Sequence, residues 1–166
     1  MNRFRIFCSA VALLSPAMAK ADWQYTRWGM TAAQVSAASG GITEPLVFDP
    51  NSVDPMLRNH LAAVAADAPT LRAPYEAGGR KYDADFHFTN DELDRVSLSL
   101  KSSNDCYKIK GEMLGSYGQP DEAYERTGVF WWRDIERKNH VMLAARSETN
   151  CSIVYKSLIN VKENGL

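Results

Sequence analysis

The sequence predicts an α+β fold, in which two tandem α-β-β-β units form one antiparallel sheet with helices packed on one face. Three observations predict it. A helix followed by three strands is expected over residues 31–101 and again over residues 104–158. Both expected helices end in glycine, which suits a left-handed helix terminus. The expected strands alternate apolar and polar residues, as is typical of sheets with one buried and one solvated face.

The first unit opens with a short helix over residues 32–39. Thr31 and Gln34 have the spacing of a capping box, in which each side chain accepts a hydrogen bond from the other residue's backbone N–H. A pair of glycines ends this helix. Pro55, favourable at a first helical position, predicts a second helix to about residue 66. The residues expected on one face of that second helix are Met56, Leu57, His60, Leu61 and Val64.

Three strands complete the first unit. The run over residues 70–76 contains Pro74, which cannot donate to a strand ladder and therefore predicts an edge strand. Gly78-Gly79 predicts a hairpin turn into a strand over residues 82–89. After a further turn, a strand is expected over residues 95–101. The last two strands each have one apolar and one polar face.

The second unit begins with a helix over residues 104–118, whose apolar residues share one face of a 3.6-residue period. We expect Ser103 or Asn104 to cap its start, and Gly118 followed by Pro120 to end it. Its apolar residues are Cys106, Ile109, Met113, Leu114 and Tyr117. The strands expected after it cover residues 128–133, 140–145 and 152–158.

Residues 1–21 have the pattern of a secretory signal peptide. Two arginines precede an apolar run that is too short to span a bilayer. Small residues make cleavage possible after Ala19 or after Ala21, and cleavage after Ala21 leaves a single α+β domain over residues 22–166. We therefore expect a periplasmic or secreted protein.

The composition excludes several classes of function. Of the 19 basic residues, three lie in residues 1–21, which leaves 16 against 20 acidic residues and a net charge near −4. A nucleic-acid partner would require a basic face, so none is expected. No later stretch is long and apolar enough to predict a membrane span. Neither a Ser-His-Asp arrangement nor a G-x-S-x-G motif is present, so no catalytic residue is predicted.

Two of the three cysteines, Cys106 and Cys151, lie outside the expected signal peptide, whereas Cys8 lies within it. Pairing is the default in an oxidising compartment. Such a disulfide would tie the start of the second-unit helix to the start of the last strand. Two free thiols are the alternative.

A resemblance to known families is carried by Trp28-Gly29-Met30-Thr31-x-x-x-Val35, by Phe86-x-Phe88 with Leu93-x-x-Val96, and by Tyr117-Gly118-x-Pro120. The chain resembles a group of small, uncharacterised secreted bacterial proteins with a W-G-M-T start. The same patterns are similar to the small lipoprotein of the outer-membrane β-barrel assembly machine and to the β-lactamase inhibitor protein, which has tandem copies of a related unit. These residues are caps, turns and core positions, so the resemblance implies a fold more than a function. The chain lacks a lipobox cysteine, and no inhibitory residue can be matched.

The adjacent residues Trp131 and Trp132 are the strongest candidates for a binding surface. Neighbouring strand residues point to opposite faces, so one indole should enter the core and the other the open face. The outward ring, with Met142 and Arg146 nearby, would form a patch of residue types that are enriched at protein interfaces. Alternatively, the N-terminal segment 23–28 covers this ring.

A weaker candidate is the row Asp83, Asp85 and His87 on one face of a strand, which could begin a metal or small-ligand site. Residues on one face lie about 6.6 Å apart, so a neighbouring strand would have to supply a further ligand. The simpler interpretation is a solvated strand face. We therefore expect a non-catalytic domain that binds another envelope protein and needs no cofactor. The competing hypothesis is an enzyme or a metal- or small-ligand-binding protein with its site at this row.

Overall fold

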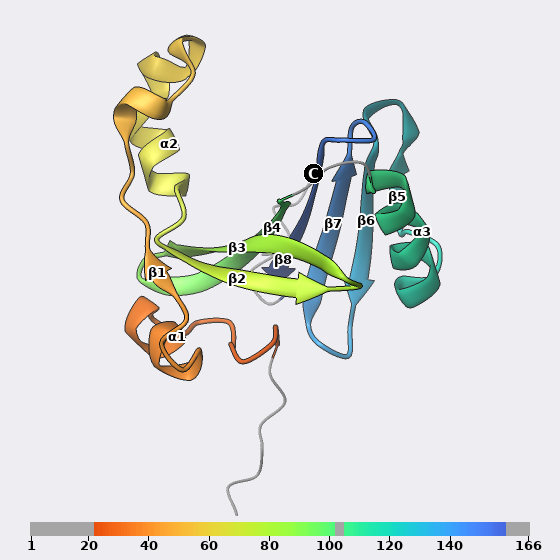
Figure 1. The fold of residues 1–166 in the computed structure, drawn as a ribbon, viewed down its shortest axis with the longest axis horizontal. Coiled ribbons are helices and arrows are strands. Elements are labelled where there is room, and N and C mark those ends of the chain that lie inside the picture. The colour runs from red at the N-terminus through yellow and green to blue at the C-terminus, as the bar shows by residue number, and fades with distance from the viewer. Residues whose placement is uncertain (1–21, 102–104, 159–166) are drawn as a thin grey trace, which may run out of the picture.

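A computed structural model of the protein describes residues 22–101 and 105–158. These residues form three α-helices, three 3₁₀ segments and eight strands, shown in Figure 1. In chain order the elements are α1 (Ala32–Ala38), β1 (Glu44–Pro45), η1 (Pro50–Ser52), η2 (Pro55–His60), α2 (Leu61–Asp67), β2 (Leu71–Ala77), β3 (Arg80–Thr89), β4 (Glu92–Leu100), α3 (Cys106–Tyr117), β5 (Glu122–Tyr124), η3 (Glu125–Thr127), β6 (Val129–Asp134), β7 (Asn139–Ala145) and β8 (Cys151–Ser157).

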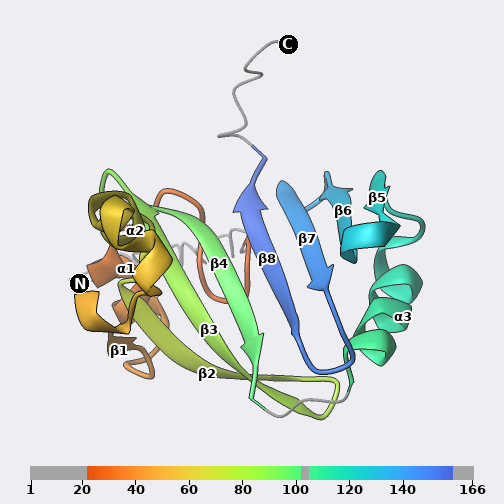
Figure 2. The ribbon, with the colours of Figure 1, turned by 90° about the horizontal axis from the view of Figure 1, so that it is seen from above.

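All eight strands of the described residues belong to one sheet with the order β1-β2-β3-β4-β8-β7-β6-β5, and every pairing is antiparallel. The predicted α+β class with an antiparallel sheet is therefore confirmed. Counted inward from either edge of the sheet, the strands follow their order in the chain, and the two series meet at the centre where β4 lies beside β8. The two halves of the chain thus meet along one pair of strands, as Figure 2 shows.

One face of the sheet, called here the core face, is buried under helices α1 and α3 and the N-terminal segment. A single row of cross-strand neighbours carries apolar side chains through five strands: Phe86, Val96, Tyr155, Val141 and Trp132. Val35 of α1 and Ile109 of α3 join the same buried cluster. The opposite face, called here the open face, carries the row Asp85, Ser97, Val154, Met142 and Trp131.

Helix α2 departs from the prediction that the helices lie on one face. Its last residue, Asp67, accepts a hydrogen bond from Arg95 on the open face, at 2.7 Å. The predicted buried stripe of this region is also wrong, because Met56 and Leu57 are 86% and 49% exposed. The first half of the predicted helix is the 3₁₀ segment η2. In Figure 1, α1 and α2 accordingly lie on opposite sides of strands β2–β4.

Several local predictions hold for evident physical reasons. The capping box of α1 is complete, with Gln34 N donating to Thr31 Oγ1 and Thr31 N donating to Gln34 Oε1. Both glycines of the β2–β3 turn have positive φ, which L-residues rarely adopt. Strand β2 is not the edge strand that Pro74 predicted, because the two-residue strand β1 lies outside it. Pro74 lies beyond the two residues that pair with β1, so its missing N–H leaves no ladder bond unmade.

Helix α3 begins with Asp105 in the N-cap position, although the carboxylate does not cap the helix. Instead it binds Arg80 and Lys108, at 3.1 and 2.8 Å. The predicted caps Ser103 and Asn104 lie outside the described residues. The helix ends as predicted, because Gly118 takes the left-handed region with φ of 77°.

The predicted disulfide between Cys106 and Cys151 is present, with the two Cα atoms 5.6 Å apart. It joins the first residue of α3 to the first residue of β8, and Cys106 is fully buried. A backbone hydrogen bond from Cys106 N to Glu148 O, at 3.3 Å, makes a second link at the same place. Within the described residues, no helix has the length and apolar character needed to cross a bilayer.

Candidate functional site

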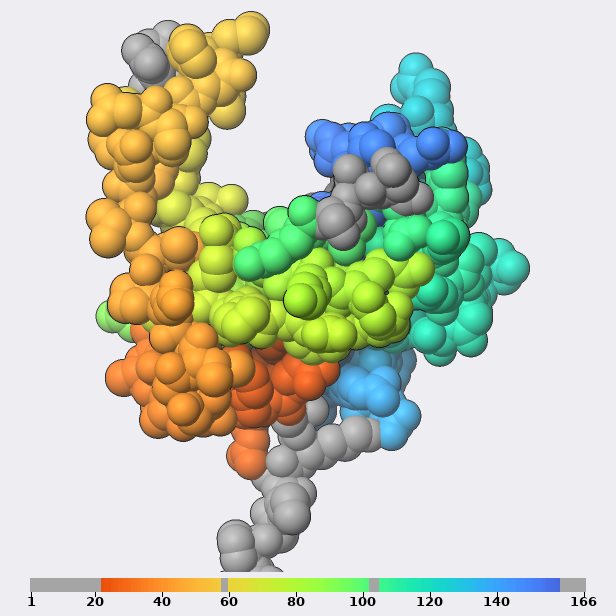
Figure 3. All heavy atoms as spheres, viewed as in Figure 1, coloured from red at the N-terminus to blue at the C-terminus, as the bar shows by residue number. Residues whose placement is uncertain are grey.

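The open face holds a groove of about 320 Å³ that reaches from helix α2 to strand β6. Strands β3, β4, β8, β7 and β6 supply its floor, while the end of α2 makes one wall. Figure 3 shows this side of the molecule hollowed between the segment 44–67, in orange and yellow, and the blue strands of the second half. The residues lining this open-face groove are Asp67, His87, Arg95, Ser97, Trp131, Met142, Val154 and Lys156.

The end of the groove that the second half of the chain forms is apolar. Trp131 and Met142 are direct cross-strand neighbours, and Met142 in turn pairs with Val154. The indole of Trp131 also stacks against the ring of His140, with centroids 4.7 Å apart. Burial lowers the pKa of His140, which favours the neutral ring against the indole. Trp131 is therefore a half-buried aromatic side chain held against strand β7.

The other end of the groove is rich in donors. Arg95 binds Asp67 and also lies 2.6 Å from His87 Nδ1, while His87 Nε2 lies 2.9 Å from Ser97 Oγ. Burial, and then the neighbouring Arg95, lower the pKa of His87. Lys156 is exposed beside Arg95 in the register of β4 and β8, and no carboxylate of the described residues pairs with it. Positive charge is therefore in excess, since Asp67 is the only carboxylate among the described residues that line the groove.

The predicted Trp pair divides as expected, because Trp132 is 2% exposed and Trp131 lies on the open face. Trp132 donates its indole N–H to Gly118 O at 3.0 Å and belongs to the core. The N-terminal segment does not cover Trp131, since Trp23 packs on Phe86 of the core face. The structure does not bring Arg146 to this patch, because Arg146 lines a separate hollow beside α3 and η3.

The row Asp83, Asp85 and His87 lies on the open face, but its polar atoms already have partners. Asp85 binds Arg72 through two hydrogen bonds of 2.6 and 2.9 Å, and Asp83 lies 2.8 Å from Lys101. Ser97 and the carbonyl of Asp67 flank the His87 ring. In the part of the chain that the structure describes, no group of three His, Cys, Asp or Glu side chains is placed to hold a metal ion.

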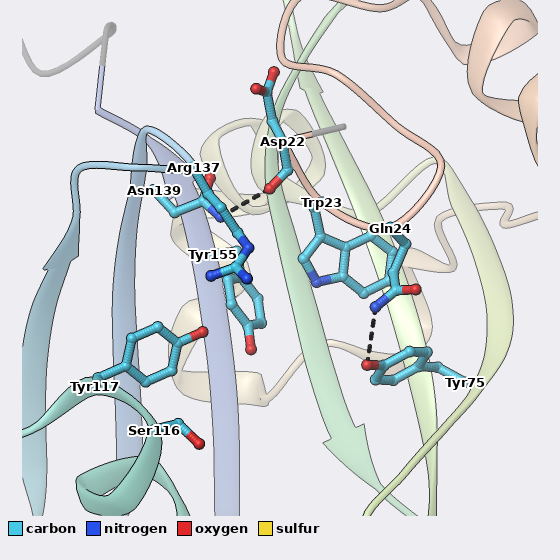
Figure 4. Close-up of a pocket in the computed structure, with 9 residues that line it drawn as sticks. All are labelled: Asp22, Trp23, Gln24, Tyr75, Ser116, Tyr117, Arg137, Asn139 and Tyr155. Carbon is cyan, nitrogen blue, oxygen red and sulfur yellow. Dashed lines mark hydrogen bonds between the residues drawn. The ribbon is translucent and has the colours of Figure 1, made fainter. Parts of the chain in front are cut away.

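A second concave site, called here the aromatic cavity, lies on the core face and has a volume of about 530 Å³ (Figure 4). The end of α3, strand β8, strand β2, the β6–β7 turn and the N-terminal segment all contribute to it. The residues lining it are Asp22, Trp23, Gln24, Tyr75, Ser116, Tyr117, Arg137, Asn139 and Tyr155. No sequence pattern predicted this site.

The N-terminal segment is fixed in place on the cavity by a small network around Asn139, which is 1% exposed. Asn139 donates to the backbone carbonyl of Asp22 at 2.8 Å and accepts from the indole N–H of Trp28 at 2.9 Å. Thr26 closes a tight turn by donating to Trp23 O at 2.8 Å. Trp23 is thereby held as one wall of the cavity.

No protein-family model, curated protein or solved structure matches the chain.

Sequence reasoning missed Arg95, Lys156 and Asp67 of the open-face groove. Arg95 and Lys156 come together only because β4 pairs with β8, and these strands are far apart in the sequence. The alternation along residues 95–101 did place Arg95 on the polar face of its strand. No polar face was predicted for the last strand, so the orientation of Lys156 and the pairing of the two strands were the missing information. Asp67 gave no such signal, because it lies at the end of a helix with no buried residue.

Proposed function

We propose that this protein is a non-catalytic, protein-binding domain of the bacterial envelope, which holds its partner in the open-face groove. The observation that carries the proposal is the pairing of an apolar patch, Trp131 with Met142, and an excess of positive charge at Arg95 and Lys156. Both lie in one groove on a sheet face that no other element of the described residues fills.

The apolar end offers an anchor of the kind that dominates protein interfaces. Tryptophan, methionine and arginine are enriched there, and a few such residues contribute most of the binding energy. Trp131 contacts His140 and is the cross-strand neighbour of Met142, both on β7, so little side-chain freedom remains to be lost when a partner binds. A partner's apolar side chain would pack against this indole.

The charged end specifies the partner's chemistry. Lys156 has no carboxylate partner among the described residues, whereas the neighbouring Arg95 is already paired with Asp67. A carboxylate from a partner would balance this charge, because opposite potentials across an interface favour association. The partner that fits is therefore an envelope protein presenting an acidic side chain beside an apolar one, as in assembly or inhibitor complexes.

The signal peptide and the tandem repeat expected from the sequence belong to the same proposal. Cleavage of residues 1–21 on export would place the domain in the periplasm or outside the cell, and the Cys106–Cys151 disulfide is consistent with such a compartment. The strand order, which follows the chain from each edge of the sheet to its centre, supports two tandem copies of one unit. Each half has one short strand more than the predicted α-β-β-β unit, β1 in the first half and β5 in the second, and the first half also contains α2. The resemblance to the assembly lipoprotein and the inhibitor protein stays a prediction.

Site-specific photo-crosslinking in the native host tests the proposal. A photoreactive residue replaces Met142 in the groove, and a matched control replaces Tyr107, which is 60% exposed on α3. We expect one discrete envelope protein to crosslink from position 142 but not from position 107. Affinity is then measured with the purified partner. Lys156→Glu should weaken binding at least about tenfold, because like charges across an interface repel.

The matched charge control is Lys108→Glu, since Lys108 is exposed on α3 and its pair with Asp105 is a surface pair of little energetic value. This control should bind as the wild type does. The proposal is wrong if both positions crosslink the same proteins, or if the two charge reversals weaken binding equally.

A further inference from the structure

The aromatic cavity has the features of a small-ligand site, and it is separate from the open-face groove. The two sites share strand β8, where Tyr155 points to the core face while Val154 and Lys156 point to the open face. A volume of about 530 Å³ falls within the usual range for ligand pockets. Because the sites lie on opposite faces, an occupant of one need not touch the other.

Aromatic rings form the walls of the cavity. The ring of Trp23 lies 5.4 Å from that of Tyr75 and 6.2 Å from that of Tyr155, measured between centroids. Tyr117 closes the other side from the end of α3, as Figure 4 shows. Flat aromatic faces of this kind pack well against the C–H faces of a saturated ring.

Polar groups that both donate and accept line the same space. Figure 4 shows the hydroxyls of Tyr117 and Tyr155 and the indole nitrogen of Trp23 facing the cavity. Ser116 is exposed at the rim of the cavity. Burial, followed by the neighbouring Tyr117, raises the pKa of Tyr155, so its hydroxyl keeps its proton at physiological pH. Hydroxyls of this kind can each donate one hydrogen bond and accept others.

The two charged side chains that line the cavity, Arg137 and Asp22, both have polar partners within the protein. Arg137 binds the buried carboxylate of Asp134 at 3.0 Å. The carboxylate of Asp22 accepts a hydrogen bond from the backbone N–H of Trp28, also at 3.0 Å. The cavity therefore offers aromatic faces and neutral hydrogen-bonding groups. Its one carboxylate without an ion pair among the described residues, Asp22, points away from the rings in Figure 4 and disfavours an anionic ligand.

From this combination, we infer that the aromatic cavity binds a neutral polyhydroxylated ligand, a mono- or disaccharide. A sugar ring would pack against the half-exposed rings of Tyr75, Tyr117 and Tyr155 around the largely buried Trp23, and its hydroxyls would exchange hydrogen bonds with Tyr117 and Ser116.

Isothermal titration calorimetry and tryptophan fluorescence of the full mature chain test this inference. The probes are glucose, galactose, N-acetylglucosamine, maltose and cellobiose, with glucuronic acid as the charged comparison. We expect at least one neutral sugar to bind with one-to-one stoichiometry and a Kd at or below about 1 mM. Tyr117→Phe should weaken that binding about 5- to 10-fold, the loss expected for one neutral hydrogen bond.

Two further variants distinguish the cavity from the rest of the surface. Ser116→Phe places a bulky ring at the exposed rim, where it should abolish binding without lowering the melting temperature. Tyr107→Phe removes a hydroxyl from the outward side of α3 and should leave binding unchanged. The inference is overturned if none of the five neutral sugars binds, if neither Tyr117→Phe nor Ser116→Phe weakens binding, or if glucuronic acid binds at least ten times more tightly than glucose. None of these outcomes bears on the open-face groove.

Discussion

Removing the disulfide by Cys151→Ser should destabilise the domain strongly. The bond closes a loop with a sequence separation of 45. In the chain-entropy model, a loop of this length contributes about 4 kcal/mol by restricting the unfolded chain. Cys106 is fully buried in the core cluster, so the variant also leaves an unpaired thiol among apolar side chains. For a domain of this size, the loss corresponds to a fall of about 8–16 °C in melting temperature.

Differential scanning calorimetry of the oxidised protein and the variant measures this difference. Wild-type protein unfolded in the presence of a reductant is the control, and it should melt close to the variant because both lack the cross-link. The hydrogen bond from Cys106 N to Glu148 O can persist in both and cannot replace the covalent link. If Cys151→Ser melts within 2 °C of the oxidised wild type, as about half a kcal/mol would allow, the structural role assigned to the bond is wrong.

Three other predictions follow from burial, backbone conformation and protonation. Trp132→Ala should lower the free energy of unfolding by about 3–5 kcal/mol in urea titrations, because the ring is 2% exposed, whereas Trp131→Ala on the open face should cost less than about 1 kcal/mol. Gly128→Ala should cost at least about 2 kcal/mol of stability, since φ is positive there and the added methyl would collide with Ala145 O. Gly115→Ala in α3 meets open space and should stabilise the protein by about 0.5–1 kcal/mol. The pKa of His87 lies below its ordinary value of 6.5, so the folded state binds fewer protons than the unfolded chain and stability should fall as the pH drops below that value. In unfolding measured as a function of pH, His87→Gln should reduce the slope of stability against pH. An unchanged slope would contradict the assignment.

Much of the local structure could be predicted from the sequence. Alternation along residues 82–89 and 95–101 placed each side chain on its correct face, because the two-residue period of a strand leaves no third choice. The capping box at Thr31 and the glycine at residue 118 marked helix ends through hydrogen bonds and φ angles that few other residues supply. The disulfide was predicted because cysteines pair by default in an oxidising compartment, and the structure contains it.

Pattern reasoning failed where tertiary contacts decide the outcome. The α2 region reads as an amphipathic helix, yet Met56 is 86% exposed since no element packs on it. Strands β1 and β5 have only two and three residues, too short to show alternation. The aromatic cavity brings Trp23, Tyr75 and Tyr155 together from three distant segments, and nothing in the local sequence reports such a meeting.

The strand order also bears on how the chain folds. Six of the seven pairings in the described residues join strands that follow one another in the chain, and the pairing of β4 with β8 is the exception. Contacts between distant residues slow folding, because the loop between them must close before the contact forms. Each half can therefore assemble early from local hairpins, and the disulfide can form within the second half alone. We expect the docking of β4 on β8 to set the folding rate, and each half to expose an unpaired strand edge until that step is complete.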